Sequence, residues 1–204
     1  ELKRIIKKYP NLNFLSGGTD LSLVVTKQKK NLENIIYLNS IDELNYIKEN
    51  DKYIEVGATT PLIQFESFIK KYYSDFNIVL KRYGSVQIRN VATMAGNIAT
   101  ASPIGDSLPL LLSLDASIVI ESFNKKTILP LKDFFIGYRK TKLKRGQFIS
   151  SIKIPIFKKN IFKAYKVSKR IDDDISSVCA SFNLEIVNKK IKNIKIAYGG
   201  MAPI

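Results

Sequence analysis

Two stretches of the sequence combine residue types that could hold an anionic or flat polar ligand, and the first is Ser16-Gly17-Gly18-Thr19. Glycines let the backbone approach a ligand closely and turn its N–H groups inward, which creates a nest for an anion. The hydroxyls of Ser16 and Thr19 add donors, so a pyrophosphate could be bound without a side-chain cation. The same residues also suit an ordinary tight turn, and both interpretations stay open from this motif alone.

The second stretch covers residues 89–106 and consists mainly of small and polar residues. Small side chains allow a flat polar ligand to approach, and Asn97 and Thr100 offer donors and acceptors. Asp106 could accept a hydrogen bond from a ribose or ribityl hydroxyl. Alternatively, the stretch is a surface loop and Asp106 caps a helix over 108–114. The two roles of Asp106 are compatible with each other.

The residue types that the sequence lacks narrow the chemistry further. There is no histidine, which excludes an imidazole base, a histidine-ligated metal and a Ser-His-Asp triad. One cysteine, Cys179, cannot form an internal disulfide, a zinc knuckle or an iron–sulfur cage. Neither a Walker-type phosphate loop nor a Gly-x-Gly-x-x-Gly turn is present. Any redox chemistry must therefore be carried by a bound organic cofactor.

The formal net charge of +15 has two possible explanations. One is a basic face for nucleic acid, an acidic partner or a phosphate-bearing ligand. The other is a composition rich in lysine, isoleucine and asparagine, as A/T-biased coding produces. The lysines stand in scattered pairs, which favours the compositional explanation. These pairs are Lys7-Lys8, Lys29-Lys30, Lys70-Lys71, Lys158-Lys159 and Lys189-Lys190.

The length of 204 residues and the 45% hydrophobic content predict one globular domain or two small ones. The sequence contains no uninterrupted apolar run of about 18 residues, so no membrane span is predicted. Because the sequence starts at Glu1 and shows no signal peptide, we expect a piece of a longer, cytoplasmic polypeptide.

Hydrophobic spacing and turn residues predict the elements that position the two stretches. Thr60-Pro61 starts a helix, with Thr60 as the N-cap and Pro61 at the first helical position. The stretch from 84 to 106 shows few strong propensities. Other helices are expected over 1–9, 76–83 and 108–114, and a brief one is expected to start at Ser40. A buried strand is expected over 35–38 and a hairpin within 45–57. Further strands are expected at 116–121, 126–129, 148–154, 161–168, 178–187 and 191–198.

Two further features receive structural interpretations. Cys179 lies in an apolar strand pattern and is expected to be a packed core thiol. The acidic run Asp172-Asp173-Asp174 lacks partners at metal-ligand spacing, so a solvated or ligand-adjacent face is expected instead of a metal site.

The order of residues in the second stretch resembles the FAD-binding signature of the molybdenum hydroxylases. The matching runs are 87–93, 96–98 and 101–106, and the turn at 17–20 is similar to a Gly-Gly-Thr-Asp turn of the same family. Later runs resemble the xanthine dehydrogenase branch, in particular its bacterial small subunit. These runs are Val25-Thr26-Lys27-Gln28, Ile36-Tyr37-Leu38, Tyr138-Arg139-Lys140-Thr141, the segment 165–170 and Tyr198-Gly199-Gly200-Met201-Ala202.

The resemblance implies an α+β fold: an FAD-binding (PCMH-type) domain of two small α/β lobes, followed by the start of a β-rich C-terminal flavoprotein domain. The lobes would cover 1–57 and 58–157, and the C-terminal part 158–204. The cofactor-binding residues that the resemblance implies are Phe14, Leu15, Ser16, Gly17, Gly18, Thr19, Asp20, Leu21, Tyr83, Thr93, Gly96, Asn97, Thr100, Ser102, Asp106, Ile149 and Lys166.

The resemblance also gives these residues approximate roles. Residues 14–21 would wrap the FAD pyrophosphate, and Tyr83 would lie near the adenine end. Tyr138 would lie near the flavin face where the nicotinamide of NAD docks, and Asp173 or Asp174 near the flavin ring. One departure from the family pattern is Ala95, which stands where a second glycine is usual before Gly96 and makes the backbone less permissive.

By this resemblance, the chain is the flavin component of a xanthine dehydrogenase. Electrons from a molybdopterin-binding large subunit would pass through 2Fe-2S clusters to FAD, then to NAD. The alternatives are the flavoprotein subunit of a carbon monoxide, nicotinate or aldehyde oxidoreductase, a basic nucleic-acid-binding module, and a structural subunit that has lost FAD. No catalytic base and no metal ligand are expected in this chain.

Overall fold

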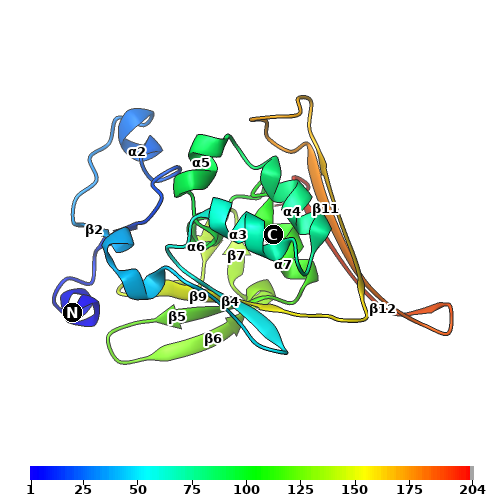
Figure 1. Ribbon diagram of the computed structural model, residues 1–204. Helices are drawn as coiled ribbons and strands as arrows, with labels where there is room; N and C mark the ends of the chain where they lie inside the picture. Colours follow the sequence, from blue (N-terminus) through cyan, green and yellow to red (C-terminus); the bar gives the residue numbers. More distant parts are fainter. Residues whose placement is uncertain (203–204) are drawn as a thin grey trace.

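The computed structural model describes residues 1–202 and combines short helices with four small sheets (Figure 1). The helices are α1 (Leu2–Lys8), α2 (Leu23–Thr26), α3 (Leu62–Ile69), α4 (Ser74–Lys81), α5 (Val86–Val91), α6 (Met94–Thr100) and α7 (Ser107–Ser113), with 3-10 turns η1 (Leu38–Ser40), η2 (Asp42–Leu44) and η3 (Leu131–Asp133). The strands are β1 (Asn13–Leu15), β2 (Ile35–Tyr37), β3 (Ile47–Glu49), β4 (Tyr53–Gly57), β5 (Ser117–Glu121), β6 (Lys126–Pro130), β7 (Phe135–Gly137), β8 (Lys140–Thr141), β9 (Phe148–Pro155), β10 (Ile161–Val167), β11 (Val178–Val187) and β12 (Lys190–Gly199). Among the described residues, no helix is both long enough and apolar enough to cross a membrane.

An antiparallel five-stranded sheet in the order β3-β4-β9-β5-β6 supports the first part of the chain. Its buried face carries Ile54, Ile118 and Ile152, which are fully buried against the helices. Helix α3 contributes Phe65 and Ile69, which stand four residues apart and so lie on one helix face. The pairing of β4 with β9 carries this sheet across the expected boundary at residue 57, and the division into three parts stays a prediction.

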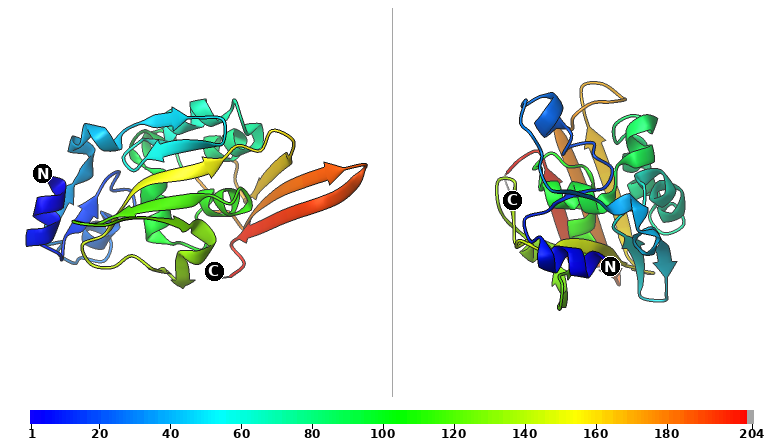
Figure 2. Two further views of the ribbon diagram at one scale, coloured as in Figure 1. Left: turned by 90° about the horizontal axis from the view of Figure 1, so that it is seen from below. Right: turned by 90° about the vertical axis from the view of Figure 1, so that its left-hand side faces the viewer.

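The β-rich C-terminal part is the three-stranded sheet β10-β11-β12. Helices α4 and α7 lie between this sheet and the five-stranded one, and the β11–β12 hairpin projects from the body (Figures 1 and 2). Buried hydroxyls join α7 to the sheet, because Ser113 Oγ and Ser181 Oγ lie 2.6 Å apart. The fold is therefore α+β with a β-rich end, as expected.

A small two-stranded parallel sheet, β1-β2, begins the chain after α1. It is anchored by a second small core that includes Ile6, Leu38 and Phe148. Both Ile35 and Tyr37 are exposed, so the prediction of a buried strand here was wrong: only one face of this narrow sheet has anything to pack against. The C-terminal end of β1 leads directly into Ser16-Gly17-Gly18-Thr19.

Most predicted strands are present, and the main differences concern helix caps. The stretch from 84 to 106 contains α5 and α6, because Ser85 and Thr93 cap them by accepting from the N–H groups of Ile88 and Gly96. Thr60 is not the N-cap of α3; its hydroxyl donates to the Tyr46 carbonyl, and Pro61 stands at the cap position. Capping hydrogen bonds thus explain why short helices form in a segment of weak propensity.

Candidate functional site

One cleft of about 640 Å³ lies where the β1 loop, the α4–α7 segment and the β10–β11 loop meet. The residues that the resemblance assigns to a cofactor all line it: Phe14, Leu15, Ser16, Gly17, Gly18, Thr19, Asp20, Leu21, Tyr83, Thr93, Gly96, Asn97, Thr100, Ser102, Asp106, Ile149 and Lys166. They come from segments up to about 150 residues apart in the chain, so only the fold brings them together.

The loop over residues 16–21 forms one wall of the cleft, and its backbone carries the polar groups. Within the described part of the chain, the N–H groups of residues 17–21 donate to no protein acceptor. Gly18 adopts a φ of +70°, which glycine tolerates without strain. Ser16 Oγ donates to Asn39 Oδ1 over 2.7 Å, so that hydroxyl anchors the loop to η1. The result is a row of free donors beside the cleft, suited to an anion.

The second wall is formed by α6 and the turn that follows it. Ser107 Oγ donates to Asn97 Oδ1 over 2.6 Å, which fixes the orientation of the Asn97 amide and leaves its N–H₂ group as a donor. Ala101 ends α6 in the left-handed conformation, with a φ of +49°. Ala95 is itself a lining residue. Ala95 is a buried residue of helix α6, and the cleft is open with its methyl group in place, so the departure from glycine does not close the cleft.

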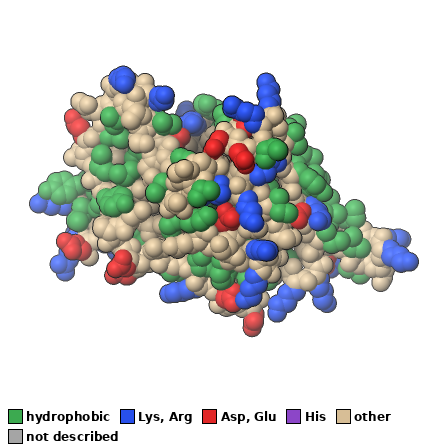
Figure 3. Space-filling view, turned by 45° about the horizontal axis from the view of Figure 1, so that its top comes forward, with side chains coloured by type: hydrophobic (Ala, Val, Ile, Leu, Met, Phe, Trp, Pro, Cys, Tyr) green, Lys and Arg blue, Asp and Glu red, His purple; other side chains and the backbone are tan. Residues whose placement is uncertain are grey.

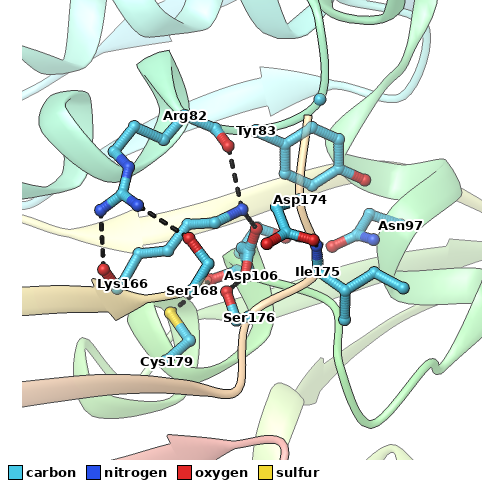
Figure 4. A network of polar contacts seen from close by, with 12 residues as sticks. Arg82, Tyr83, Asn97, Asp106, Lys166, Ser168, Asp174, Ile175, Ser176 and Cys179 are labelled. Carbon is cyan, nitrogen blue, oxygen red and sulfur yellow. Dashed lines mark hydrogen bonds and ion pairs between the residues drawn. The ribbon is translucent and has the colours of Figure 1, made fainter. Parts of the chain in front are cut away.

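Asp106 and Lys166 form a buried ion pair at the base of the cleft (Figure 4). Lys166 Nζ lies 2.6 Å from Asp106 Oδ2 and also donates to the Arg82 carbonyl over 2.9 Å. Ser176 Oγ donates to the other oxygen of Asp106. Asp106 stands at the N-cap position of α7, but its carboxylate makes no side-chain capping hydrogen bond, because Lys166 of β10 and Ser176 of the following loop bind its two oxygens.

Tyr83 and Ile149 complete the lining from opposite sides of the fold. Burial, together with the negative charges of Asp106 and Asp20, raises the pKa of Tyr83 to about 12. The phenol is therefore neutral over the physiological range, and its hydroxyl keeps a proton to donate.

The rim of the cleft contains two loops whose importance the sequence only partly indicated. Tyr138 does not line the cleft and is 63% exposed, whereas its neighbour Arg139 does line it. Arg139 Nη1 lies 3.7 Å from Asp20 Oδ2, across the mouth. Asp173 and Asp174 both line the rim, in agreement with a ligand-adjacent position. Arg139 was missed as a site residue, although it belongs to the Tyr-Arg-Lys-Thr run quoted above.

The described residues contain no group of His, Cys, Asp or Glu side chains arranged to hold a metal ion. In the acidic run, Asp174 instead accepts from the N–H groups of Arg170 and Ile175. These hydrogen bonds, that of the Arg170 N–H first among them, lower the pKa of Asp174. The Asp174 carboxylate thus stabilises the conformation of the loop to which it belongs.

Lysine and arginine side chains on the face in Figure 3 are interspersed with acidic ones and form no dense block there. This view agrees with the scattered pairs in the sequence. It offers no support on that face for a nucleic-acid surface, which needs clustered positive charge.

Cys179 is expected to be unreactive while the chain is folded. Its thiol is buried and lies 3.5 Å from the Asp106 carbonyl. Burial, together with the charge of Asp106, raises its pKa to about 12, so almost no thiolate exists near pH 8. An aromatic disulfide reagent should label the native protein far more slowly than the urea-unfolded protein. Equal labelling rates in the two states would contradict this placement.

Residues 1–157 match the family described as FAD binding domain in molybdopterin dehydrogenase, and residues 163–204 match the CO dehydrogenase flavoprotein C-terminal domain. A xanthine dehydrogenase of Emericella nidulans is 33% identical over all of this chain, which spans only 16% of that protein. A glyceraldehyde dehydrogenase medium chain of Sulfolobus acidocaldarius is 28% identical over 98% of this chain, and the match covers 72% of that protein's length. A solved carbon monoxide dehydrogenase of Hydrogenophaga pseudoflava, which lacks the Mo-pyranopterin moiety, has the same fold. The TM-score is 0.92 and the sequence identity 23%, over 99% of this chain and 71% of that chain.

Proposed function

Because this chain belongs to the family of FAD-binding domains of the molybdopterin dehydrogenases, we propose that it is the FAD-binding, electron-transferring part of a xanthine dehydrogenase. The observation that carries the proposal is the cleft: every residue assigned to the cofactor from the sequence lines it. The xanthine dehydrogenase assignment is supported by the 33% identical fungal relative.

The donor set of the cleft fits FAD. The free N–H groups of residues 17–21 suit a pyrophosphate, which needs several donors aimed at one point. The Asn97 amide and the Tyr83 hydroxyl offer polar contacts farther along the cleft. Apolar walls from Leu15, Ile88 and Ile149 suit the faces of flat rings.

When bound, FAD supplies the capacity to accept electrons singly and to release them as a hydride. The chain's own residues bind and orient it. The loop over 16–21 would bind the phosphates with its free N–H groups, and the buried Asp106–Lys166 pair joins the start of α7 to β10 in the wall of the cleft. Tyr83 retains its proton, because its pKa is about 12, and so its neutral hydroxyl can donate a hydrogen bond to the cofactor.

We extend the proposal to the partners of this part. Electrons would come from a molybdopterin-binding large subunit through 2Fe-2S clusters, and NAD would accept them in the cytoplasm. The exposed Tyr138, on the turn between β7 and β8 beside the mouth of the cleft, is available to a docking nicotinamide. The chain spans 16% of the fungal relative, so these partners are proposed for the whole enzyme and not for this chain alone.

The alternative is the flavoprotein subunit of another molybdenum hydroxylase. It is favoured by one observation: a glyceraldehyde dehydrogenase medium chain is 28% identical over 98% of this chain, which covers 72% of that protein. The two candidates share the FAD cleft and differ in the substrate of the molybdenum subunit. Purified whole complex assayed with xanthine, nicotinate and glyceraldehyde would distinguish them.

An absorption spectrum of the purified chain tests the cofactor assignment. We expect flavin bands and, after heat denaturation, release of FAD and not of FMN into the supernatant, because the donor row suits a pyrophosphate. Anaerobic addition of NADH to the loaded protein should bleach these bands if NAD is the acceptor. A colourless protein that takes up no added FAD would overturn the assignment.

A further inference from the structure

Arg82 follows the last residue of α4 and extends to the C-terminal sheet, where its guanidinium meets three acceptors, two of which, Lys166 and Ser168, are drawn in Figure 4. Its Nη1 donates to the Lys166 carbonyl over 2.7 Å and its Nη2 to Ser168 Oγ over 2.8 Å. Its Nε donates to the Ile171 carbonyl over 3.2 Å. A planar guanidinium can serve three separate acceptors in fixed directions, which a lysine ammonium cannot do with the same geometry.

The acceptors of Arg82 belong to the end of β10 and to the loop over 168–177 that connects β10 to β11. This loop brings Asp173, Asp174 and Ile175 to the rim of the cleft. Its apolar side chains do not anchor it, because Ile171 is 74% exposed and Ile175 is 65% exposed. The position of the loop must therefore depend on polar contacts.

Besides the backbone hydrogen bond from the Ser177 N–H to the Val167 carbonyl over 2.8 Å, side-chain hydrogen bonds fix the described loop at two places. Among the residues that the structure describes, the side-chain hydrogen bonds from this loop to other parts of the chain involve Arg82 near its start and Asp106, through Ser176, near its end. Within the loop, Ser168 Oγ donates to the Arg170 carbonyl over 2.6 Å and Asp174 accepts from the Arg170 N–H over 2.8 Å. The first half of the loop thus forms one internally bonded unit that Arg82 holds.

The same residue also connects to the base of the cleft. The Arg82 carbonyl accepts from Lys166 Nζ, the partner of Asp106, and the next residue, Tyr83, lines the cleft. Arg82, at the end of α4, therefore contacts the buried ion pair, adjoins Tyr83 in the chain and holds the loop that carries Asp173 and Asp174.

We propose that Arg82 is a positioning residue that fixes the loop over 168–177 against the cleft and thereby slows the release of bound FAD. The proposal rests on the proposed FAD site and does not assign Arg82 any contact with the cofactor. It predicts that loss of the guanidinium loosens the loop locally while the core of the fold is unchanged.

The experiment uses the FAD-loaded chain and compares Arg82→Met with Lys81→Met, a matched control that removes one positive charge from the adjacent, exposed position. Fluorescence recovery on dilution measures the rate of FAD release, and hydrogen–deuterium exchange measures the opening of residues 168–177 and, for comparison, of α3. We expect Arg82→Met to release FAD about tenfold faster, and exchange to rise in the loop but not in α3. Lys81→Met should match the unmodified chain.

The intermediate variant Ser168→Ala keeps Arg82 and removes one of its three acceptors, so it should lie between the control and Arg82→Met. Unchanged release together with unchanged loop exchange in Arg82→Met would overturn the proposal. A rise in exchange throughout the chain would also overturn it, because that pattern indicates a merely structural role. If the unmodified chain binds no FAD, the proposed function fails, and loop exchange in the flavin-free protein still tests the role of Arg82.

Discussion

Lys166→Met is expected to lower the free energy of unfolding by about 3–5 kcal/mol, because it leaves the Asp106 carboxylate buried without its cation. The Lys166 side chain is 2% exposed and that of Asp106 8%, so solvent can compensate only a small part of the lost partner. Urea unfolding followed by circular dichroism measures the effect in a chain that has no tryptophan. FAD binding should weaken as well, because the pair connects two walls of the cleft.

A matched control for this prediction is Lys163→Met, on the same strand β10. Lys163 Nζ lies 3.4 Å from Asp75 Oδ2, but its side chain is 51% exposed. Solvent screens such a pair, so its loss should cost less than about 1 kcal/mol. The double variant Asp106→Asn with Lys166→Met removes both charges and should recover part of the stability lost in the single variant. Equal destabilisation by Lys163→Met and Lys166→Met would contradict the assignment of a buried pair.

Gly17→Ala is expected to destabilise the chain by about 1–3 kcal/mol and to weaken FAD binding about tenfold or more. A Cβ atom at Gly17 would lie 2.1 Å from the Val91 carbonyl oxygen and 2.8 Å from the Ala92 Cα. Both obstacles are backbone atoms at the end of α5, so no side chain can rotate away. The loop over 16–21 would have to move outward, and its row of N–H donors would move with it.

The control for Gly17→Ala is Gly137→Ala, on strand β7 outside the cleft lining. A Cβ atom at Gly137 would approach nothing closer than 3.9 Å, and only the flexible Lys140 side chain. Its unfolding free energy should change by no more than about 0.5 kcal/mol, with FAD affinity unchanged. Calorimetric titration with FAD measures both variants. FAD affinity in Gly17→Ala equal to that in Gly137→Ala would show that the loop is not part of the site.

The sequence predicted the strands of the C-terminal half well, because apolar residues there alternate strongly and turn residues separate the runs. The strands predicted at 148–154 and 178–187 correspond to β9 and β11. The segment of small residues was harder to predict. Helices α5 and α6 depend on the hydroxyl caps of Ser85 and Thr93, and capping is a single local contact that periodicity does not reveal.

The residues of the candidate site were likewise predictable from local sequence only in part. Local sequence marked the glycine turn and the Asn97 region as candidates but left an ordinary turn and a surface loop open, and the family resemblance assigned them to a cofactor. It did not single out Arg139, because several other basic residues surround it within 139–145 and nothing local distinguishes it from them. Nor did it reveal that Arg82 serves three acceptors, because these lie more than 80 residues further along the chain.

By itself, the sequence determined the family, the order of most elements, the absence of histidine chemistry and part of the set of residues that line the cleft. Only the tertiary structure decided how those residues are held. It paired Asp106 with Lys166, sixty residues away, where a helix cap was the local alternative. The physical reason is that capping and turn preferences act between near neighbours, whereas burial of a charge selects its partner from whatever the fold brings within reach.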